Sequence, residues 1–281
     1  MTHAASPLVS VRGLHVDFPS RRGRVEAVRG IDFELGREKL GIVGESGSGK
    51  SVACRALLGL VPPPGVVRAD RLELFGVDHA AADAAAWRAI RGARIGLVMQ
   101  DPRYSLNPVL TVGTQMTEAL ALRRGLAGSA AEREGLAMLE AVRLREPRRV
   151  WRAHPHELSG GMGQRVMIAM MLAMRPDVLI ADEPTSALDV TVAGEILELL
   201  DLLVRDRGMA LVLVSHDLRM VQAFCDRVLV MYAGRIVDRC PAGELERSTH
   251  PYTRGLLECA PSLDAPVTVL PTLVRDPAWA R

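Results

Sequence analysis

The stretch that decides the fold is KLGIVGESGSGKS, residues 39–51, in which a short apolar strand runs into a glycine-rich turn. Residues 44–51 satisfy the pattern G-x-x-x-x-G-K-[ST], and the SVACRALLGL that follows is typical of a helix. The glycines let the backbone fold around a phosphate with its N–H groups pointing inward. Lys50 would reach the β- and γ-phosphates, and the Ser51 hydroxyl would ligate Mg²⁺. The sequence therefore predicts a nucleotide-phosphate loop made of Gly44, Glu45, Ser46, Gly47, Ser48, Gly49, Lys50 and Ser51.

The composition places this loop in a protein with an aliphatic core. The chain has 281 residues, of which 48% are hydrophobic and only 4% aromatic, and this suits parallel strands covered by helices. Lys plus Arg number 35 against 33 Asp plus Glu, so the charge balance does not indicate nucleic acid or a polybasic membrane anchor. The four cysteines, Cys54, Cys225, Cys240 and Cys259, form no C-x-x-C pair. They indicate reduced, structural residues of a cytosolic protein.

No apolar stretch is long enough to cross a membrane. The longest run, VMIAMMLAM at residues 166–174, is roughly half as long as a membrane-spanning helix requires. The N-terminal MTHAASPLVS lacks the basic-then-apolar pattern of a secretory signal. We therefore expect a cytosolic chain that associates with a membrane only through partners.

Alternating and periodic patterns predict the remaining elements. The predicted strands are residues 8–18, a pair of pieces within 25–35, 177–183 and 210–216, and a hairpin over 227–239 that turns at Ala233-Gly234. Residues 114–147 are rich in Ala, Leu, Arg and Glu and favour helices, as does AGEILELLDLLVRD between the later strands. The residues after the hairpin are punctuated by proline and predict a small appendage.

Polar residues follow three of the short apolar strands. Asp182 and Glu183 end one of them, and adjacent acids there are costly unless a metal or water uses them. Beside the phosphate loop we expect Asp182 to bind Mg²⁺ through water and Glu183 to polarise an attacking water. Gln100 could ligate Mg²⁺ or position water, and His216 could hydrogen-bond the γ-phosphate. Taken alone, the acids could be solvated by bulk water, Gln100 could be an ordinary surface residue, and His216 a polar cap.

A second glycine-rich stretch, ELSGGMGQR at residues 157–165, precedes another apolar helix pattern. The N–H groups and dipole of a helix N-terminus favour an anion. This stretch has no lysine or metal ligand of its own, so it would complete a phosphate site rather than make one.

In this order the phosphate loop, Gln100, LSGG, LIADEPTSALD and His216 resemble the nucleotide-binding domain of ABC transporters over about residues 8–240. The resemblance implies an α/β fold, in which a P-loop NTPase (RecA-like) core carries an antiparallel β subdomain and an inserted α-helical subdomain. The whole chain, 1–281, would be a single ATP-binding domain. Its core would be 8–100 and 166–240, its helical subdomain 101–165 and its C-terminal extension 241–281.

The resemblance also implies roles for residues. LSGG would be the signature motif, which contacts the γ-phosphate of ATP bound to the other subunit of a head-to-tail dimer; its residues are Ser159, Gly160, Gly161 and Gln164. The loop that communicates across this dimer would be Ser186, Ala187, Leu188 and Asp189. Phe18 lies where the family places an aromatic that stacks on adenine, although a Phe ending a strand is equally typical of a core. Gly163 replaces a basic residue or another helix former, at a cost of about 1 kcal/mol, and would loosen the signature loop.

Finer motifs, QDPRYSLNPVLTVG, HPHELSGGM, TSALDVTV and HPYTRGLL (250–257), resemble the dipeptide, oligopeptide and nickel importer ATPases. This implies an ATP-hydrolysing subunit with ATP and Mg²⁺ as cofactors, at the cytoplasmic face of the bacterial inner membrane. Its partners would be two transmembrane permease subunits, a second and paralogous ATP-binding subunit and, indirectly, an extracytoplasmic substrate-binding protein, with no nucleic acid.

Two questions stay open at this point. Many peptide members carry a C-terminal cysteine cluster, whereas this sequence ends in VRDPAWAR, which keeps nickel or metal chelates open as cargo beside peptides. The alternative function is a non-transport ABC ATPase in DNA repair or translation. Repair members insert a long coiled coil before the signature, and translation members carry two such domains in one chain. Neither feature occurs here, since the sequence has one set of motifs and no sustained heptads.

Overall fold

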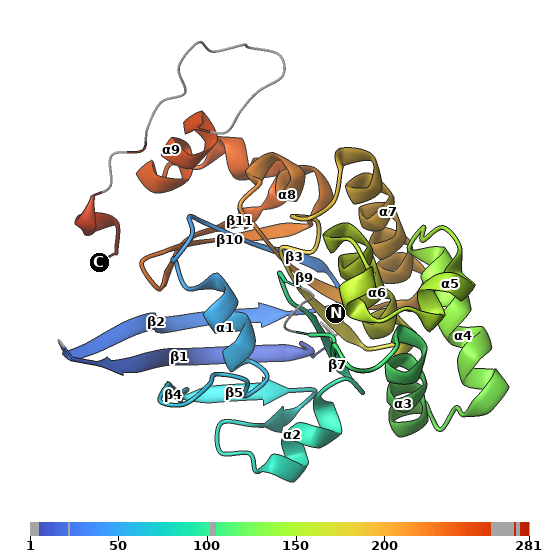
Figure 1. Ribbon diagram of the computed structural model, residues 1–281. Coiled ribbons are helices and arrows are strands. Elements are labelled where there is room, and N and C mark those ends of the chain that lie inside the picture. Colours follow the sequence, from blue (N-terminus) through green and yellow to red (C-terminus); the bar gives the residue numbers. More distant parts are fainter. Residues whose placement is uncertain (1–5, 22, 102–104, 260–272, 274–275, 281) are drawn as a thin grey trace, which may run out of the picture. The chain divides into compact units, whose positions relative to one another are not determined.

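The structure is a computed structural model that describes residues 6–21, 23–101, 105–259, 273 and 276–280 (Figure 1). The chain divides into two compact units. The first comprises Met1–Trp87 and Val212–Arg281, and the second comprises Arg88–Leu211.

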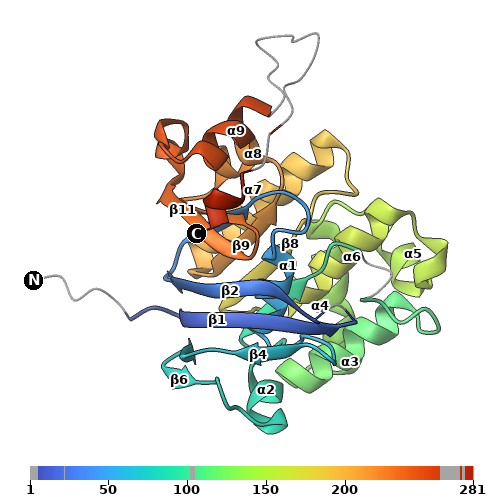
Figure 2. The same cartoon turned by 90° about the vertical axis from the view of Figure 1, so that its left-hand side faces the viewer.

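An antiparallel sheet in the first unit is built on two long strands. β1 (Val9–Ser20) pairs with β2 (Gly23–Leu35) from end to end, and β4 (Val66–Arg68) lies beside them (Figure 2). β5 (Arg71–Leu74) also pairs with β1, and β6 (Val77–Asp78) pairs with β5. The two strand pieces expected within residues 25–35 are therefore one strand. Register shifts in the β1–β2 ladder absorb the irregularity, because a bulge bends a strand without ending it.

The phosphate-loop strand lies in a second group of strands of this unit. β3 (Lys39–Val43) pairs in parallel with β10 (Arg227–Tyr232), which pairs antiparallel with β11 (Arg235–Pro241). The turn between β10 and β11 has φ 46° at Ala233 and 83° at Gly234. Two positive φ values in succession are what a tight hairpin turn requires, so the predicted hairpin is confirmed.

Three helices of this part of the chain are short. α1 (Lys50–Ala56) follows the phosphate loop and packs against β1 and β2 (Figure 1). It ends before LLGL (57–60), which the sequence pattern includes in the helix. Gly59 adopts a left-handed φ of 59°, and the carbonyls of Arg55 and Ala56 accept hydrogen bonds from the N–H groups of residues 58–60, which closes the helix in a turn. The other two are α2 (Ala84–Ile90), which crosses the division between the units, and α8 (Leu218–Phe224).

The C-terminal extension is packed against this first unit. It contains η3 (Ala242–Arg247), α9 (Pro251–Cys259) and η4 (Pro277–Ala280). The side chains of Tyr252 and Thr253 on α9 are fully buried. The predicted appendage is thus anchored through the beginning of α9, while much of residues 260–281 lies outside the described residues.

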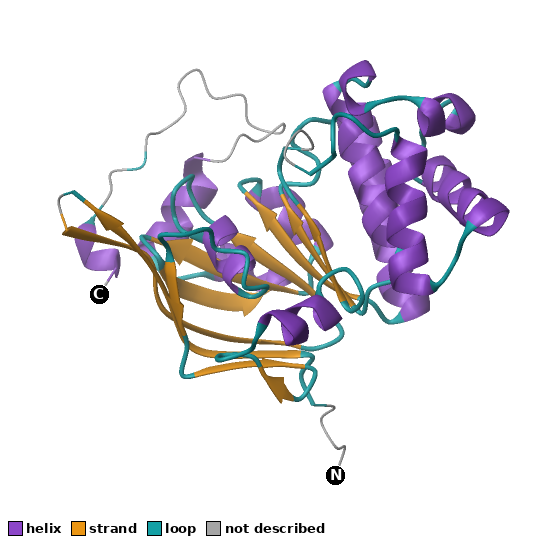
Figure 3. Cartoon of the chain, turned by 60° about the horizontal axis from the view of Figure 1, so that its bottom comes forward, coloured by secondary structure: helices purple, strands orange, loops and turns teal. Residues whose placement is uncertain are grey.

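The second unit contains two parallel strands and most of the long helices. β7 (Ile95–Val98) pairs with β8 (Val178–Asp182), with Val98 opposite Ala181. The helices are α3 (Val112–Arg124), α4 (Gly128–Ala141), α5 (Pro147–Arg152), the single turn η2 (Pro155–Glu157), α6 (Gly160–Ala173) and α7 (Val190–Arg207). α3, α4 and α6 pack against one another, and Figure 3 shows them within its group of purple helices. β9 (Ala210–Ser215) runs across the division between the units.

The core is aliphatic, as the composition predicts. Among the described residues, Phe33 and Tyr252 are the only aromatic side chains in the buried hydrophobic set. No helix within the described ranges is long and apolar enough to cross a membrane. The predicted limits of the helical subdomain, 101–165, stay a prediction. In the structure these helices group with β7, β8 and α7 because α6 packs on β7.

Candidate functional site

The phosphate loop, residues 44–51, joins the end of β3 to the start of α1. Gly44 has φ 148° and Gly49 has φ 101°, both in the range that favours glycine. A Cβ atom on Gly44 would lie within 3.0 Å of the carbonyl oxygen of Met231, and one on Gly49 within 3.0 Å of that of Ala27. The glycines therefore also let the loop press against the neighbouring strands β10 and β2, which the motif alone does not reveal.

Lys50 fills the centre of this loop. Its side chain is only 6% exposed, and its ammonium group donates hydrogen bonds to the carbonyl oxygens of Gly44 at 2.7 Å and Glu45 at 2.8 Å. A third contact reaches the Ser48 hydroxyl at 3.4 Å. A buried ammonium group needs such partners, and the result is a cation held at the point where the loop would meet an anion.

Two contacts from distant segments hold the loop in shape. The N–H group of Gly234, in the β10–β11 turn, donates to the carbonyl of Ser48 at 3.0 Å. The N–H group of Glu45 donates to the hydroxyl of Tyr252 at 3.0 Å. The sequence predicts neither contact, although the hairpin and the HPYTR stretch that supply them both stand out as motifs.

Phe18 lies near the end of β1, where its ring is half-buried. A Cβ atom built on Gly65 would lie 2.7 Å from one ring carbon of Phe18, Cε1. The ring therefore packs directly against the backbone at Gly65. Its neighbour Asp17 is buried and forms ion pairs with Arg24 and with Arg68. The hydrogen bond from Arg24 holds the pKa of Asp17 below its usual value, and the charge of Arg68 acts in the same direction. Adenine stacking on Phe18 stays a prediction.

In the second unit Gln100 and Glu183 meet, because the strands that precede them, β7 and β8, are paired in parallel. The Gln100 amide donates a hydrogen bond to a Glu183 carboxylate oxygen at 3.0 Å. Asp182 is buried at the end of β8. Glu183 has φ 50°, a left-handed conformation that costs a residue with a side chain about 1–3 kcal/mol and is typical of active sites. The structure thus joins the predicted base to the predicted amide.

The signature stretch begins α6 with an ordinary cap. The Ser159 hydroxyl accepts a hydrogen bond from the N–H group of Met162 at 3.3 Å, and both Ser159 and Gly160 are exposed. The Gly163 N–H group donates to the Ser159 carbonyl at 2.9 Å, so glycine at 163 leaves the first helical turn intact. The N-terminus of α6 is therefore exposed to solvent at Ser159 and Gly160.

The loop of Ser186, Ala187, Leu188 and Asp189 adjoins this helix N-terminus. A Cβ atom on Gly161 would lie 3.1 Å from the Ala187 carbonyl oxygen and 3.4 Å from a Leu188 methyl carbon. Asp189 caps α7 by accepting from Val192, and Ser186 donates to the Glu183 carbonyl. The loop therefore connects the candidate base with the signature helix.

Of the two remaining predicted site residues, Gln164 lies differently from the expectation, whereas His216 follows its strand as predicted. Gln164 is fully buried, its amide nitrogen lies 3.5 Å from the carbonyl oxygen of Met99, and its amide oxygen has no hydrogen-bond partner in the described part of the chain. One turn into α6, this side chain faces inward, so in this conformation it cannot reach a nucleotide on another subunit. His216 is exposed just after β9.

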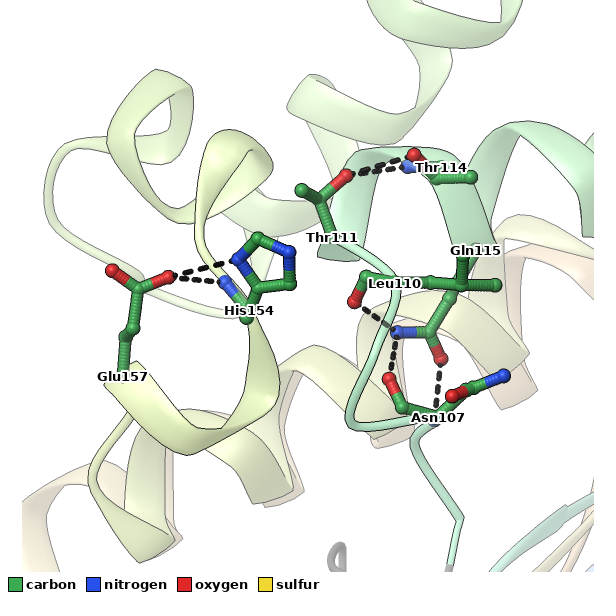
Figure 4. A network of polar contacts seen from close by, with 7 residues as sticks. All are labelled: Asn107, Leu110, Thr111, Thr114, Gln115, His154 and Glu157. Atoms are coloured by element: carbon green, nitrogen blue, oxygen red, sulfur yellow. Dashed lines mark hydrogen bonds and ion pairs between the residues drawn. The ribbon is translucent and has the colours of Figure 1, made fainter.

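Polar contacts hold residues 107–115, at the start of α3, and residues 154–157, just before the signature (Figure 4). The buried Gln115 side chain accepts from the Asn107 N–H group at 2.8 Å and donates to the carbonyls of Asn107 and Leu110, each at 3.0 Å. Glu157 accepts from the His154 N–H group just before the signature. The SLNPVLTVG and HPHE stretches of the family motifs therefore supply the side chains and backbone groups that hold these two segments in shape. Residues 102–104 of the predicted QDPRYSLNPVLTVG motif lie outside the described residues.

A parallel-strand phosphate loop with a central lysine defines a P-loop nucleoside triphosphatase. Residues 28–186 match the family model described as ABC transporter. The dipeptide transport ATP-binding protein DppD of Bacillus subtilis is 44% identical over 260 residues, covering 92% of this chain and 78% of that protein. The oligopeptide transport ATP-binding protein OppD of Haemophilus influenzae is 43% identical over 278 residues, covering 97% and 84%.

A solved structure agrees with these matches. The ATP-binding cassette MJ0796, in a dimeric post-hydrolysis state bound to ADP and Pi, matches with a TM-score of 0.74 and 28% identity, over 83% of this chain and 98% of that one. The chain belongs to the ABC transporter family. It is an ABC-type ATPase with the predicted P-loop NTPase fold.

Proposed function

We propose that this chain is the ATP-hydrolysing subunit that drives a multi-subunit bacterial importer of di- and oligopeptides. The observation that carries the proposal is the loop of residues 44–51, which holds a buried Lys50 ammonium against its own carbonyls. The peptide cargo is favoured over nickel because relatives at 43–44% identity are named for dipeptide and oligopeptide transport.

In this proposal the chain's own residues hold the nucleotide. Phe18 stacks on adenine, and the backbone N–H groups of Gly44, Glu45, Ser46, Gly47, Ser48 and Gly49 surround the phosphates, together with Lys50 and Ser51. Lys50 exchanges its bonds to the Gly44 and Glu45 carbonyls for phosphate oxygens. The buried position of its ammonium group favours this exchange, because a phosphate offers it charge as well as hydrogen bonds.

A magnesium ion would be held by the Ser51 hydroxyl, the Gln100 amide oxygen and Asp182. These donors fit Mg²⁺, which prefers oxygen ligands and takes only one or two carboxylates when substrate phosphates complete its shell. Bound there, the ion would neutralise charge on the phosphates. The residues described include no cluster of three or more His, Cys, Asp or Glu side chains that would hold a metal unaided.

Glu183 is the proposed general base, and it takes a proton from the water that attacks the γ-phosphate. The Gln100 amide fixes one carboxylate oxygen at 3.0 Å, and this limits the orientations that the carboxylate can adopt. His216 hydrogen-bonds the γ-phosphate in this proposal. A base held in one geometry removes part of the entropy cost of reaching the transition state.

The signature residues Ser159, Gly160 and Gly161 would act on ATP bound to a second, paralogous ATP-binding subunit. Support comes from the exposed helix N-terminus and its contact with residues 186–189. ATP binding would close the two subunits together, and hydrolysis would reopen them. The motion would reach two transmembrane permease subunits at the cytoplasmic face of the bacterial inner membrane through the region beside Gln100.

Affinity capture of the chain from detergent-solubilised native membranes, followed by mass spectrometry, tests this proposal. We expect two polytopic proteins, a second ATPase and a substrate-binding protein, and we expect that binding protein to release peptides. Release of nickel or a metal chelate would correct the cargo. Recovery from the soluble fraction with ribosomes or DNA-bound factors would overturn transport in favour of the non-transport alternative.

A further inference from the structure

One peptide group of the phosphate loop is held from both sides. The carbonyl of Gly44 accepts from the Lys50 ammonium at 2.7 Å, and the N–H group of the same peptide unit, that of Glu45, donates to the Tyr252 hydroxyl at 3.0 Å. A trans peptide is planar, with its N–H and C=O groups pointing in opposite directions. Fixing the N–H group therefore also fixes the direction of the carbonyl that holds Lys50.

The Tyr252 ring is firmly placed. Its side chain is 0% exposed, and its ring centroid lies 4.6 Å from that of Tyr232 at the end of β10 and 5.7 Å from that of Trp279 in η4. A buried phenol keeps its hydroxyl hydrogen-bonded, since an unpaired one is costly. The hydroxyl is thus a fixed point against which the loop is oriented.

Polar residues of the HPYTR segment dock the start of α9. Asp238 on β11 accepts hydrogen bonds from the hydroxyls of Thr253, at 2.7 Å, and Ser248. The His250 ring accepts from the N–H group of Tyr252 at 3.2 Å. These contacts connect a motif of the C-terminal extension, through Tyr252, to a loop that lies 207 residues earlier in the chain.

We propose that Tyr252 is a positioning residue of the phosphate loop, through which the C-terminal extension sets the affinity of the loop for ATP. This inference rests on the proposed function, in which residues 44–51 hold the phosphates. Without the hydroxyl, the Gly44–Glu45 peptide keeps the bond from Lys50 to its carbonyl but loses the bond that orients its N–H group, so ATP itself must supply more of the loop's order. Loss of this preorganisation lowers affinity.

The test is Tyr252→Phe in the assembled transporter, with Tyr232→Phe as the matched control. Both variants remove one phenol oxygen from the same aromatic cluster, but within the described residues the Tyr232 hydroxyl makes no hydrogen bond to the loop. We expect Tyr252→Phe to bind a non-hydrolysable ATP analogue about five- to tenfold more weakly, the effect of one neutral hydrogen bond. The KM for ATP should rise in proportion while kcat changes by less than about twofold.

Hydrogen exchange gives a second measurement that does not depend on activity. The Glu45 amide should exchange faster in Tyr252→Phe than in the wild type or in Tyr232→Phe, because its acceptor is gone. Unchanged nucleotide affinity, or unchanged exchange at Glu45, would overturn the positioning role. A lowered melting temperature with normal affinity would also overturn it, since that would show a purely structural tyrosine. Normal ATP binding by Lys50→Ala would instead refute the proposed loop function, so the two failures are distinguishable.

Discussion

Replacing Gly49 with alanine would place a methyl group within 3.0 Å of the carbonyl oxygen of Ala27. Ala27 lies inside β2, which is paired with β1 on both sides of this position. Ala27 itself lies at the register shift between its paired neighbours Glu26 and Val28, and these two pairings limit how far its carbonyl can turn away. Gly49 also has φ 101°, a conformation that residues with a Cβ atom rarely adopt.

The two effects can be estimated separately. A left-handed conformation costs an ordinary residue about 1–2 kcal/mol, and forcing extra volume into a packed site costs about 1–3 kcal/mol. We therefore expect Gly49→Ala to lower the free energy of unfolding by about 2–5 kcal/mol. Gly47 is the matched control, because it has φ 82° but nothing lies within 4 Å of a Cβ atom built there. Gly47→Ala should show the conformational cost alone.

The assay is urea unfolding of the nucleotide-free chain, followed by tryptophan fluorescence and circular dichroism. Gly49→Ala should be less stable than Gly47→Ala by about 1–3 kcal/mol, which corresponds to roughly 2–4 °C in melting temperature for each kcal/mol. Equal stabilities would refute the claim that the loop is pressed against β2 at this position.

Three further predictions concern single side chains. Lys50→Ala should abolish productive ATP binding in a fluorescence titration, because the loop loses its one central cation; retained tight binding and turnover would contradict the assignment. Ser159→Arg should leave ATP binding by the isolated chain intact and block hydrolysis in the assembled transporter, because it fills the exposed helix N-terminus; collapse of isolated binding would contradict action on the partner's ATP. Asp17→Asn should destabilise the fold at neutral pH, because the pKa of Asp17 is lowered by its hydrogen bond from Arg24. That stabilisation is complete above the unfolded pKa of about 3.9 and is lost as pH falls through the lower folded pKa, so urea midpoints of wild type and variant should converge in acid; a gap that widens in acid would contradict it.

The parts of the site that the sequence predicts are those set by neighbouring residues and by parallel strands. The phosphate loop follows from its own glycines and Lys50. The positions of Gln100 and Glu183 after short apolar strands are predicted, but their contact depends on the parallel pairing of β7 with β8, which the structure shows. The hairpin turn follows from Ala233-Gly234.

The remaining features depend on contacts between distant residues, which no local pattern contains. The bond from Glu45 to Tyr252 spans 207 residues, and the approach of Gly49 to Ala27 depends on how β2 passes the loop. The position of Gln164 in the motif predicts an exposed residue of the signature, but the structure buries its side chain on the inner face of α6. The strained φ of Glu183 likewise arises from the tertiary structure around β8.

The most direct test of the account is ATP binding and turnover by Glu183→Gln in the assembled transporter. Glutamine keeps the shape of the side chain and an oxygen that can accept the Gln100 hydrogen bond, while it removes the base. We predict that this variant binds ATP normally and hydrolyses it at least about a hundredfold more slowly. Turnover near the wild-type rate would contradict the account and place the catalytic base elsewhere.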